Sequence, residues 1–485
     1  MIGSGPAGVA CAHALAVRGA RPIVLDGGAR LEPDREAAIG RIPVDELRRS
    51  FPFDFDELPL KPVHGSTFAY APSEIEADGF GAVPSLAVGG LSAVWGAAML
   101  PYSERDHEGW PFGPHELAAH YRAVLGFVPL AAEEDALAAN FPLYSNARPL
   151  RATSQVSSML AGLGRLQAPG VVGGRARLAV DVDRCDFVGT CLLGCPRFAI
   201  WTSAETLRAL IADGSVEHRP GTAVCRVEER SGKPRIHLRN GDALDADIVL
   251  VAAGTLATTR IALASLGAYD REVRLLDSAY YTFPLLQWRG APRERGNTLA
   301  QAFLEIDDRA TSTRPVHVQL YGFNDLMLQA AAARLRMPEA IVERVLTPLL
   351  GRLVFAQGYL HSDASPGARA VLRRDGVLFV RGEGDARPAA ERVLRKLRSL
   401  RREMRMDPIG PLLRAWPPGK GFHVGGSLPM CRRPSGLETD LLGRLPGFTR
   451  VHLADASVFP TVPATTITLA AMANAHRIAA ASLES

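Results

Sequence analysis

One histidine beside two glycines offers the clearest capacity for chemistry in this sequence. In GFHVGGSLPM, residues 421–430, His423 is followed closely by Gly425 and Gly426. An imidazole titrates near neutral pH, so it can accept the proton of a substrate hydroxyl. A histidine next to a turn is more often a buried core residue with a satisfied hydrogen bond. The segment alone leaves both interpretations open, and the rest of the chain must decide between them.

A glycine motif opens the chain. Gly3, Gly5 and Gly8 form G-x-G-x-x-G at the start of an apolar helical stretch, and the strand-like PIVLD that follows ends at Asp26. Such glycines let the backbone approach a pyrophosphate at a helix N-terminus, and the acid can accept hydrogen bonds from an adenosine ribose. The pattern predicts a Rossmann-type dinucleotide site. Because only two residues precede the motif, we expect a first strand that is truncated or unusually short.

The rest of the chain contains no second G-x-G-x-x-G. Flavoproteins that take electrons from NAD(P)H usually carry one, so the sequence predicts a single dinucleotide. VGGLSAVWGAAML, residues 88–100, has the small residues that a loop needs to pass close to a flat ring. DADIVLVAAGTLATTRIALAS, residues 245–265, predicts a buried strand followed by a helix, either near an adenine or pyrophosphate or as an ordinary strand–turn–helix.

Composition limits the class of protein. The 485 residues are 47% hydrophobic and 22% charged, with 46 glycines and 35 prolines, which is typical of a large, loop-rich globular protein. A net charge of +4 and a basic stretch at 395–405, typical of a solvated helix face, give no nucleic-acid footprint. No apolar run is long enough to span a bilayer, and six cysteines form no disulfide framework. We expect a cytoplasmic protein with no nucleic-acid or membrane partner.

Six segments stand in the order typical of one enzyme family. They are GSGPAG (3–8), GGLSAVWG (89–96), GWPFGPHELAAHYRAV (109–124), VLVAAGTLATTRIAL (249–263), HVGGSLPM (423–430) and VHLADASVFPTVPATTITLAAMANAHRIA (451–479). The chain resembles the glucose-methanol-choline oxidoreductases, which are FAD-dependent. The resemblance implies an α/β fold in which a Rossmann-type FAD-binding domain is interwoven with an antiparallel-sheet α+β substrate-binding domain.

The resemblance also implies how the chain is divided between these domains. We expect the FAD-binding domain at 1–130, 201–272 and 415–485, a lid or substrate-side segment with a cysteine loop at 131–200, and the substrate-binding domain at 273–414. The similarity is concentrated in the flavin-binding segments and is weak across the middle of the chain.

The residues expected to hold FAD follow from the same resemblance. The ADP half would be held by the N-terminal motif and the acid after it: Gly3, Gly5, Pro6, Ala7, Gly8 and Asp26. The loop lining the isoalloxazine would be Gly89, Gly90, Ser92, Trp95 and Gly96. Val224 would meet the adenine, Ala253 and Gly254 would lie near it, and Asp455 with Ala456 would contact the ribitol and pyrophosphate. The loop contains no histidine or cysteine, so we expect non-covalent FAD.

The resemblance changes the interpretation of His423, which matches the family's active-site histidine. It implies that His423 is the base that takes the hydroxyl proton as hydride leaves for flavin N5. Family members usually place a second His or Asn just after SVFP, where this chain has Ala464, Thr465 and Thr466. A threonine hydroxyl can hydrogen-bond a substrate oxygen but is no base near neutral pH. We therefore expect His423 to act with Thr465 and Thr466 beside it, and His476 to be structural.

Three segments of the middle region alternate as strands do: 316–325, 353–363 and 370–385. Period two places His317, Gln319 and Tyr321 on one face, and Gln357, Tyr359 and His361 on one face of another strand. Amides and phenols suit a polyhydroxylated ligand, so Gln319, Tyr321, Gln357 and Tyr359 are the expected substrate-binding residues. Each one singly could equally face solvent. Residues 324–352 predict one or two helices.

Cys185, Cys191 and Cys195 form a C-x5-C-x3-C-P pattern. Iron–sulfur and zinc sites normally need four ligands, and Val188 stands where a ferredoxin-like run would have another cysteine. We expect no metal and a cysteine loop packed beside the active site, with a redox-active pair as the minor alternative.

Together these features predict an FAD-dependent oxidoreductase that oxidises a CH–OH group, most simply of a sugar, glycoside or related natural product. Oxygen or a quinone- or dye-like carrier would be the electron acceptor. Two alternatives stay open: a flavin-assisted elimination or isomerisation with no net oxidation, suggested by the missing second His or Asn, and a flavin-binding protein without catalysis.

Overall fold

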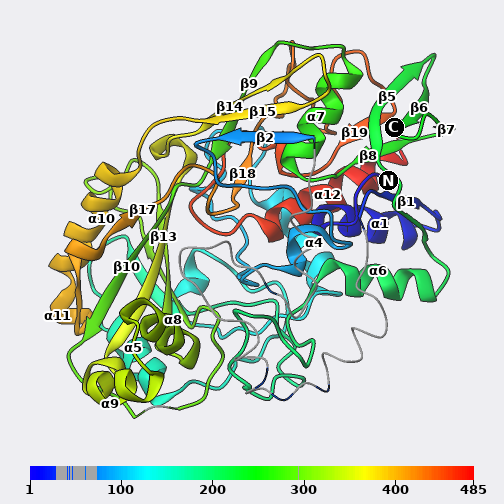
Figure 1. Ribbon diagram of the computed structural model, residues 1–485. Helices are drawn as coiled ribbons and strands as arrows, with labels where there is room; N and C mark the ends of the chain where they lie inside the picture. Colours follow the sequence, from blue (N-terminus) through cyan, green and yellow to red (C-terminus); the bar gives the residue numbers. More distant parts are fainter. Residues whose placement is uncertain are drawn as a thin grey trace.

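The computed structural model describes residues 1–28, 41, 43, 46, 61, 74–292 and 294–484, apart from the side chain of residue 347. The polypeptide forms a parallel sheet at the dinucleotide motif, a large antiparallel sheet, and smaller sheets between and beside them (Figure 1).

A parallel sheet contains the N-terminal motif. Strand β1 (Ile23–Asp26) pairs with β4 (Glu217–Pro220), and β8 (Val249–Val251) pairs with β19 (Val451–Leu453), both in parallel. Ile2 joins the two pairs through bridges to Leu25 and Val251. The expected first strand is therefore represented by one bridging residue, and segments from the beginning, middle and end of the chain meet here.

Helices cover this sheet. Helix α1 (Pro6–Ala16) packs against α12 (Thr468–Ser482), and α12 also packs against α4 (His115–Leu125) (Figure 1). Both α1 and α12 are rich in alanine and buried around most of their circumference, so their backbones approach closely. α6 (Ser203–Ala212) packs beside α1, and α7 (Thr255–Ser265) against a three-stranded antiparallel sheet of β5 (Val224–Arg230), β6 (Lys233–Leu238) and β7 (Ala243–Asp245).

The large antiparallel sheet has seven strands in the described part of the chain. They are β3 (Val171–Arg175), β10 (Tyr280–Gln287), β11 (Ala302–Ile306), β12 (Val316–Gly322), β13 (Leu353–Leu360), β16 (Met406–Pro408) and β17 (Arg414–Ala415). One face packs on a core with α5 (Ser154–Leu163), α10 (Arg387–Ser399) and α11 (Arg401–Met404). β12 is buried along its whole length, as suits its β-branched and aromatic residues.

A further five-stranded sheet among the described residues joins segments that the sequence assigned to different domains. It contains β2 (Ile75–Asp78), β9 (Glu272–Asp277), β14 (Ala368–Leu372), β15 (Leu378–Gly382) and β18 (Val424–Gly425). The strands predicted at 370–385 are present, but they pair here and not with β12 and β13. The pairing of β14 with β9 and of β15 with β2 is non-local, so alternation within one segment could not reveal it.

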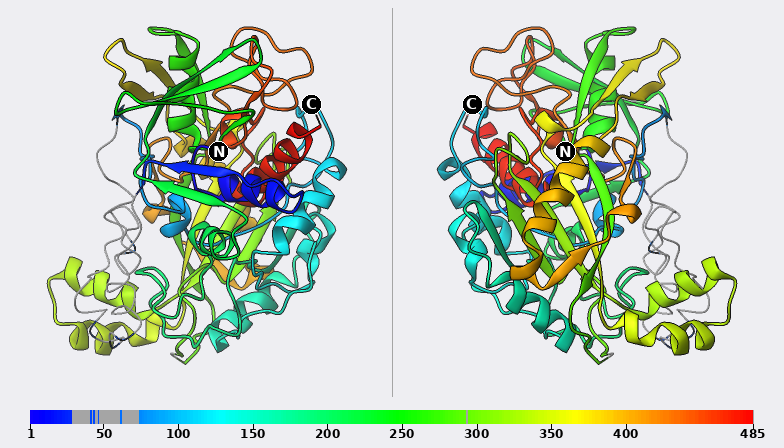
Figure 2. Two further views of the ribbon diagram at one scale, coloured as in Figure 1. Left: turned by 90° about the vertical axis from the view of Figure 1, so that its right-hand side faces the viewer. Right: turned by 90° about the vertical axis from the view of Figure 1, so that its left-hand side faces the viewer.

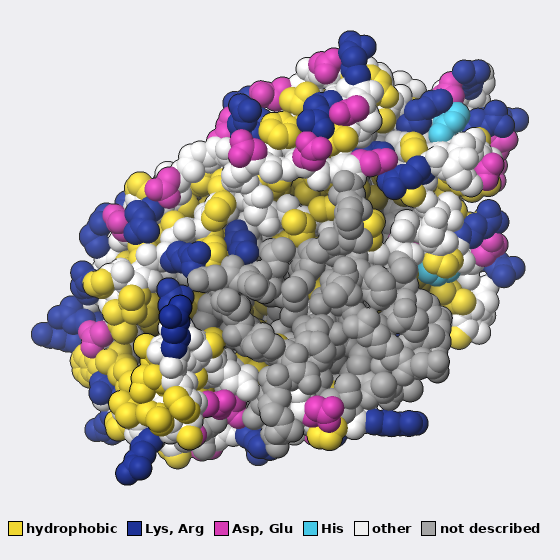
Figure 3. Space-filling view, in the orientation of Figure 1, with side chains coloured by type: hydrophobic (Ala, Val, Ile, Leu, Met, Phe, Trp, Pro, Cys, Tyr) yellow, Lys and Arg dark blue, Asp and Glu magenta, His cyan; other side chains and the backbone are white. Residues whose placement is uncertain are grey.

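Helices α8 (Asp325–Leu335) and α9 (Glu339–Leu350) form a pair that projects from the body (Figure 2). Hydrophobic side chains gather over this pair in Figure 3, where Leu335, Met337, Ile341, Val345 and Leu349 are exposed. Among the described residues, we find no helix with both the length and the apolar character needed to cross a membrane.

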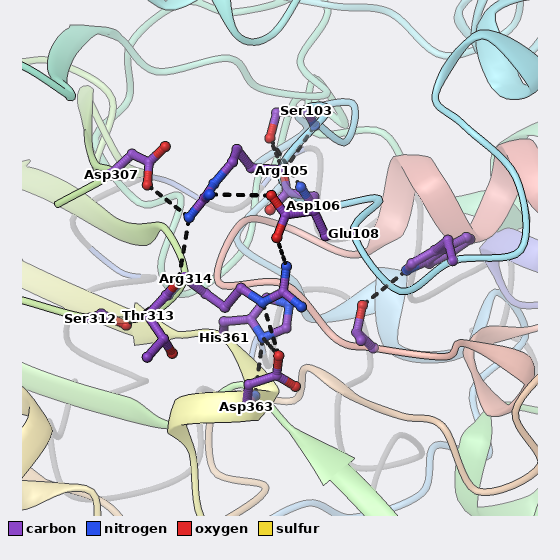
Figure 4. Close-up of polar contacts among 12 residues, drawn as sticks. Ser103, Arg105, Asp106, Glu108, Asp307, Ser312, Thr313, Arg314, His361 and Asp363 are labelled. Carbon is purple, nitrogen blue, oxygen red and sulfur yellow. Dashed lines mark hydrogen bonds and ion pairs between the residues drawn. The ribbon is translucent and has the colours of Figure 1, made fainter. Parts of the chain in front are cut away.

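A charged network fastens the segment at 103–108 to the large sheet (Figure 4). Arg105 forms ion pairs of 3.2 Å with both Glu108 and Asp307, and Arg314 forms ion pairs with Glu108 and, at 2.9 Å, with Asp363. Arg314 is mostly buried, whereas its carboxylate partners are exposed. The network therefore links the region after the glycine-rich loop at 89–96 to the ends of β11, β12 and β13.

Candidate active site

One cavity of about 780 Å³ connects the two parts of the molecule. Gly5 and Asp26 line it at the dinucleotide motif, and Gln357 and His423 line it at the large sheet. Its size is within the range of cofactor and ligand sites. Residues expected to hold a cofactor and residues expected to bind a substrate therefore share a continuous space.

The glycines of the N-terminal motif serve different purposes. A Cβ on Gly8 would overlap the carbonyl oxygen of Gly3, so Gly8 permits close packing of helix and strand. A Cβ on Gly5 would meet no atom of the described residues within 4 Å, because Gly5 faces the cavity. Gly5 caps α1 without a side-chain hydrogen bond, and the first turn contains no acid. The amide groups and the dipole of this helix end suit an anion such as a pyrophosphate.

Asp26 has a buried oxygen with no partner among the described residues. Its Oδ1 accepts a 2.7 Å hydrogen bond from the Gly28 amide, whereas its Oδ2 accepts none. Leaving a buried carboxylate oxygen unpaired is costly. Asp26 lines the cavity, so a ligand hydroxyl there can satisfy Oδ2. A free carboxylate oxygen at the end of β1 is what an acid needs in order to bind a ribose hydroxyl.

The glycine-rich loop at 89–96 lies against the N-terminal motif. Gly89 and Gly90 have φ of +93° and +58°, and a Cβ on Gly90 would lie 3.2 Å from the Gly5 Cα. Ser92 Oγ donates a 2.6 Å hydrogen bond to the Gly89 carbonyl and accepts one of 3.0 Å from the Ser203 amide. Gly90 and Ser92 line the cavity, and the Ser92 hydroxyl is used to hold the loop in place.

Trp95 and Gly96, at the end of this loop, line the cavity, and so does Lys61. Trp95 Nε1 donates a 2.9 Å hydrogen bond to the Trp201 carbonyl, and the buried Lys61 ammonium donates one to the Trp95 carbonyl. Burial lowers the pKa of Lys61 to about 8. Sequence reasoning missed Lys61 because no motif surrounds it, and only the folded chain brings it beside Trp95.

Asp455 organises the wall near the end of β8. Its Oδ2 accepts hydrogen bonds of 2.9 Å from the Gly254 amide and 2.5 Å from the Thr258 hydroxyl, and its Oδ1 accepts one of 2.9 Å from the Ser457 amide. Burial raises the pKa of Asp455. The other predicted residues of this wall also line the cavity: Val224, Ala253, Gly254 and Ala456.

His423 lines the opposite end of the cavity, just before β18. Its ring stacks on Tyr359 at a centroid distance of 4.8 Å and an interplanar angle of 24°. Its Nδ1 is buried and has no hydrogen-bond partner in the described structure. Burial, and secondarily the nearby His317, lower the pKa of His423 to about 3. At neutral pH the imidazole is therefore uncharged and can accept a proton.

Four polar side chains of β12 and β13 line the cavity near His423. Cross-strand register places Gln319 opposite Gln357. The Tyr321 hydroxyl lies 2.8 Å from Gln319 Oε1 and 3.0 Å from Gln357 Oε1, and the Tyr359 hydroxyl lies 3.5 Å from Gln357 Oε1. The structure thus brings all four predicted substrate-binding residues together as a connected, uncharged group.

The two histidines predicted on the same strands have other surroundings. His317 shares the cavity-facing side of β12 but is fully buried, and its Nδ1 lies 2.5 Å from Glu305 Oε1. His361 is also fully buried and its Nδ1 accepts a 3.0 Å hydrogen bond from the Asp363 amide. Neither belongs to the described cavity lining.

The two threonines after SVFP are placed differently. Thr466 lines the cavity, and its Oγ1 accepts a 2.9 Å hydrogen bond from the Leu100 amide. Thr465 lies outside the described lining, and its buried hydroxyl has no partner among the described residues. Their proposed part in catalysis stays a prediction. His476 also lies outside the lining and contacts His120, with 2.9 Å between the two Nδ1 atoms.

Cys185, Cys191 and Cys195 form no disulfide bond among the described residues. Leu192, within their loop, lines the cavity, which places the loop beside the site. In the part of the chain that the structure describes, no group of three or more His, Cys, Asp or Glu side chains is arranged to hold a metal ion. The expectation that the protein binds no metal stays a prediction.

The chain combines a parallel sheet that has a glycine-rich first turn with a large antiparallel sheet, which is the combination expected from the sequence resemblance. Among solved structures, the chain is similar to the crystal structure of pyridoxine 4-oxidase from Mesorbium loti. The TM-score is 0.61 at 16% sequence identity, over 99% of this chain and 97% of that one. The fold expected from the sequence resemblance is thus confirmed. No family model matches the chain, and no curated protein matches it by sequence.

Proposed function

We propose that the chain is an FAD-dependent oxidoreductase that removes hydride from the carbon of an alcohol while His423 accepts the hydroxyl proton. The observation that carries this proposal is the continuous cavity, which has the unpaired Asp26 oxygen at one end and the uncharged His423 imidazole at the other. FAD bound in this cavity would supply the hydride acceptor.

The chain's own residues fit such a cofactor. The uncapped N-terminus of α1 would receive the pyrophosphate, and Asp26 Oδ2 would accept a ribose hydroxyl. The loop around Gly90 and Ser92 is tied to the N-terminal motif by a hydrogen bond from the Gly89 amide to Ser4 Oγ and is closed by the bond from Ser92 Oγ to the Gly89 carbonyl, so it can line a flat ring without rearrangement. No histidine or cysteine lies in that loop, which favours non-covalent binding.

At the end of the cavity near the large sheet, His423 would take the proton of the alcohol. The connected polar group of Gln319, Tyr321, Gln357 and Tyr359 would orient the carbon that bears the hydroxyl. This group offers amide and phenol hydrogen bonds without formal charge. Tyr280 stacks on Trp416 with 6.1 Å between the ring centroids, and both rings add aromatic surface to the cavity. A sugar, a glycoside or another ring-bearing alcohol suits such a lining. The similarity to an enzyme named an oxidase favours oxygen as acceptor, with a quinone- or dye-like carrier as the alternative.

The test begins with purified protein. Acid or heat denaturation should release free FAD, and flavin that stays attached to the denatured chain would contradict non-covalent binding. Anaerobic mixing with a panel of sugars, glycosides and aromatic alcohols should then bleach the flavin absorbance, and an acceptor should restore it. Bleaching that reverses without an acceptor would support a non-oxidative reaction. A flavin that no alcohol bleaches would identify a binding protein without this catalysis.

A further inference from the structure

A buried acid–imidazole pair lies in the same row of the large sheet as Tyr359, the residue on which His423 stacks. Register places Glu305 of β11 opposite His317 of β12, His317 opposite Tyr359 of β13, and Tyr359 opposite Tyr280 of β10. These side chains share the face of the sheet that looks toward the cavity. His423 stacks on Tyr359, so the pair is separated from His423 by one aromatic ring.

The pair is closely bonded and isolated from water. His317 is 0% exposed and Glu305 4% exposed, and 2.5 Å separates Nδ1 from Oε1. Within the described structure, His317 Nε2 has no hydrogen-bond partner. A buried acid–base pair is often no more stabilising than apolar residues of similar size. Its presence in a row otherwise made of aromatic rings therefore favours a role in function.

We propose that Glu305 and His317 are positioning residues that keep the His423 imidazole in its proton-accepting form; the inference rests on the proposed function of His423 as base. When His317 carries a second proton, that proton pairs with Glu305, and the positive charge then lies one strand nearer to Tyr359 and His423 than the negative charge does. A second positive charge on His423 is then unfavourable in these apolar surroundings. The same bond fixes the His317 ring, which contacts the Tyr359 ring at 6.1 Å.

Other charged and titratable groups face this row and must be considered. The carboxyl of Asp106, in the segment at 103–108, and the guanidinium of Arg177 both interact electrostatically with Glu305. Burial raises the pKa of Asp106 to about 7. The phenols of Tyr280 and Tyr359 have pKa values that burial raises far above neutral. His317 is the titratable group whose charge acts directly on His423, and its effect lowers the pKa of His423, as the proposal requires.

The test measures the proton affinity of His423 directly. Histidine-selective NMR of the intact, flavin-loaded protein from about pH 2.5 to about pH 7 brackets the pKa of His423, which is about 3, and reports each imidazole, with His423→Ala used to assign the signal. The variants are His317→Gln and Glu305→Gln, which remove the positive charge or its partner and retain hydrogen-bonding groups. Phe303→Leu is the matched control, because Phe303 lies on β11 and contacts the His317 ring at 4.8 Å but carries no charge.

We expect His423 to bind its proton about threefold to tenfold more tightly in His317→Gln and Glu305→Gln, and to behave as in the wild type in Phe303→Leu. The low-pH decline of flavin reduction should move to higher pH in the same two variants. A His423 signal that titrates identically in both charge variants and the wild type overturns the proposal, as does an equal shift in Phe303→Leu. The NMR measurement needs no substrate, so failure of this inference is distinguishable from failure to oxidise any alcohol.

Discussion

At the scale of single residues, the surroundings of His423 determine what its imidazole can do. A histidine in water is about half protonated near pH 6.5, whereas burial holds the pKa of His423 near 3. The ring is therefore uncharged at neutral pH, the form in which it can accept a proton. Its Nδ1 has no partner among the described residues, so stacking on Tyr359 holds the ring in place.

Replacement of His423 by alanine should separate catalysis from folding. We expect His423→Ala to bind FAD and fold normally but to reduce its flavin about 10²- to 10⁴-fold more slowly, the usual contribution of general acid–base catalysis. Anaerobic stopped-flow absorbance measures this rate. Thr466→Ala, which removes a cavity-lining hydroxyl but no base, is the control and should be far less impaired. A wild-type rate in His423→Ala would place the base elsewhere.

The pH dependence of flavin reduction should reflect burial of the base. His423 is deprotonated at every pH well above its lowered pKa of about 3, so the rate should be nearly constant from about pH 5 to pH 8. It should fall only as pH approaches the pKa from above, because protonation removes the acceptor lone pair. Stopped-flow reduction across this range checks the profile. A decline centred near pH 6.5 would show that bound flavin and substrate leave His423 as hydrated as a free imidazole.

The neighbouring threonines offer a matched pair for stability. Thr466→Val leaves the buried Leu100 amide without its acceptor and should lower the free energy of unfolding by about 1–3 kcal/mol. Thr465→Val removes a buried hydroxyl that has no partner among the described residues, so it should change stability by less than about 1 kcal/mol or increase it slightly. Urea unfolding of both variants measures the difference. Equal losses would mean that Thr465 bonds to a group outside the described residues.

At the scale of elements, the glycine motif and α1 combine two requirements in six residues. Gly8 makes room for the backbone of Gly3, whereas Gly5 leaves room for a ligand. Glycine is thus required at position 8 by packing within the protein, and at position 5 by the space that a ligand needs.

Alanine substitutions should reveal this difference. Gly8→Ala should destabilise the folded chain, because its Cβ would overlap the Gly3 carbonyl. Gly5→Ala should fold with nearly wild-type stability as apoprotein, since its Cβ meets no atom within 4 Å in the described part of the chain, but should bind FAD weakly because the methyl group enters the cavity. Thermal unfolding without FAD and fluorescence titration with FAD separate the two effects. Tight FAD binding by Gly5→Ala would argue against a pyrophosphate at this helix end.

Elements with a strong local pattern were predictable from the sequence. The glycine motif with Asp26, the strands β8, β12 and β13, and the helices at 324–352 all follow from short-range spacing. Strand pairing between distant segments was not predictable: β2 and β18 join β9, β14 and β15 only because the whole chain folds together. Lys61 and Glu305 also escaped prediction, although a glutamate within the apolar run of β11 was a usable signal of a buried polar pair.

At the scale of the whole molecule, buried titratable groups should make stability depend on pH. Burial lowers the pKa of several histidines to about 3 or 4: His107, His120, His361, His423 and His476. It raises the pKa of two carboxyls, Asp106 and Asp277, to about 7. The buried histidines and the two buried carboxyls have opposite effects on stability below neutral pH.

We expect stability to fall as pH decreases from about 6.5 toward 4. In this window the unfolded chain protonates its histidines while the folded chain does not, so protons favour unfolding. Asp106 and Asp277 act in the other direction, because they bind protons in the folded state at a higher pH than in the unfolded state, but they are fewer. Denaturant unfolding at pH 7.5, 6 and 5 measures the trend. A stability that rises steadily over this range of decreasing pH would mean that the carboxyls dominate.

The packing of α1 on α12 has a consequence for how the protein is made. The two helices lie at opposite ends of the described chain, and Cys11 Sγ donates a 3.3 Å hydrogen bond to the Ala475 carbonyl. On the ribosome, the glycine motif emerges more than 400 residues before the strand and helix that complete its sheet, β19 (Val451–Leu453) and α12 (Thr468–Ser482). The nascent chain therefore holds an unfinished sheet edge until β19 and α12 have been synthesised, and a cofactor held by this sheet would be loaded only after that point.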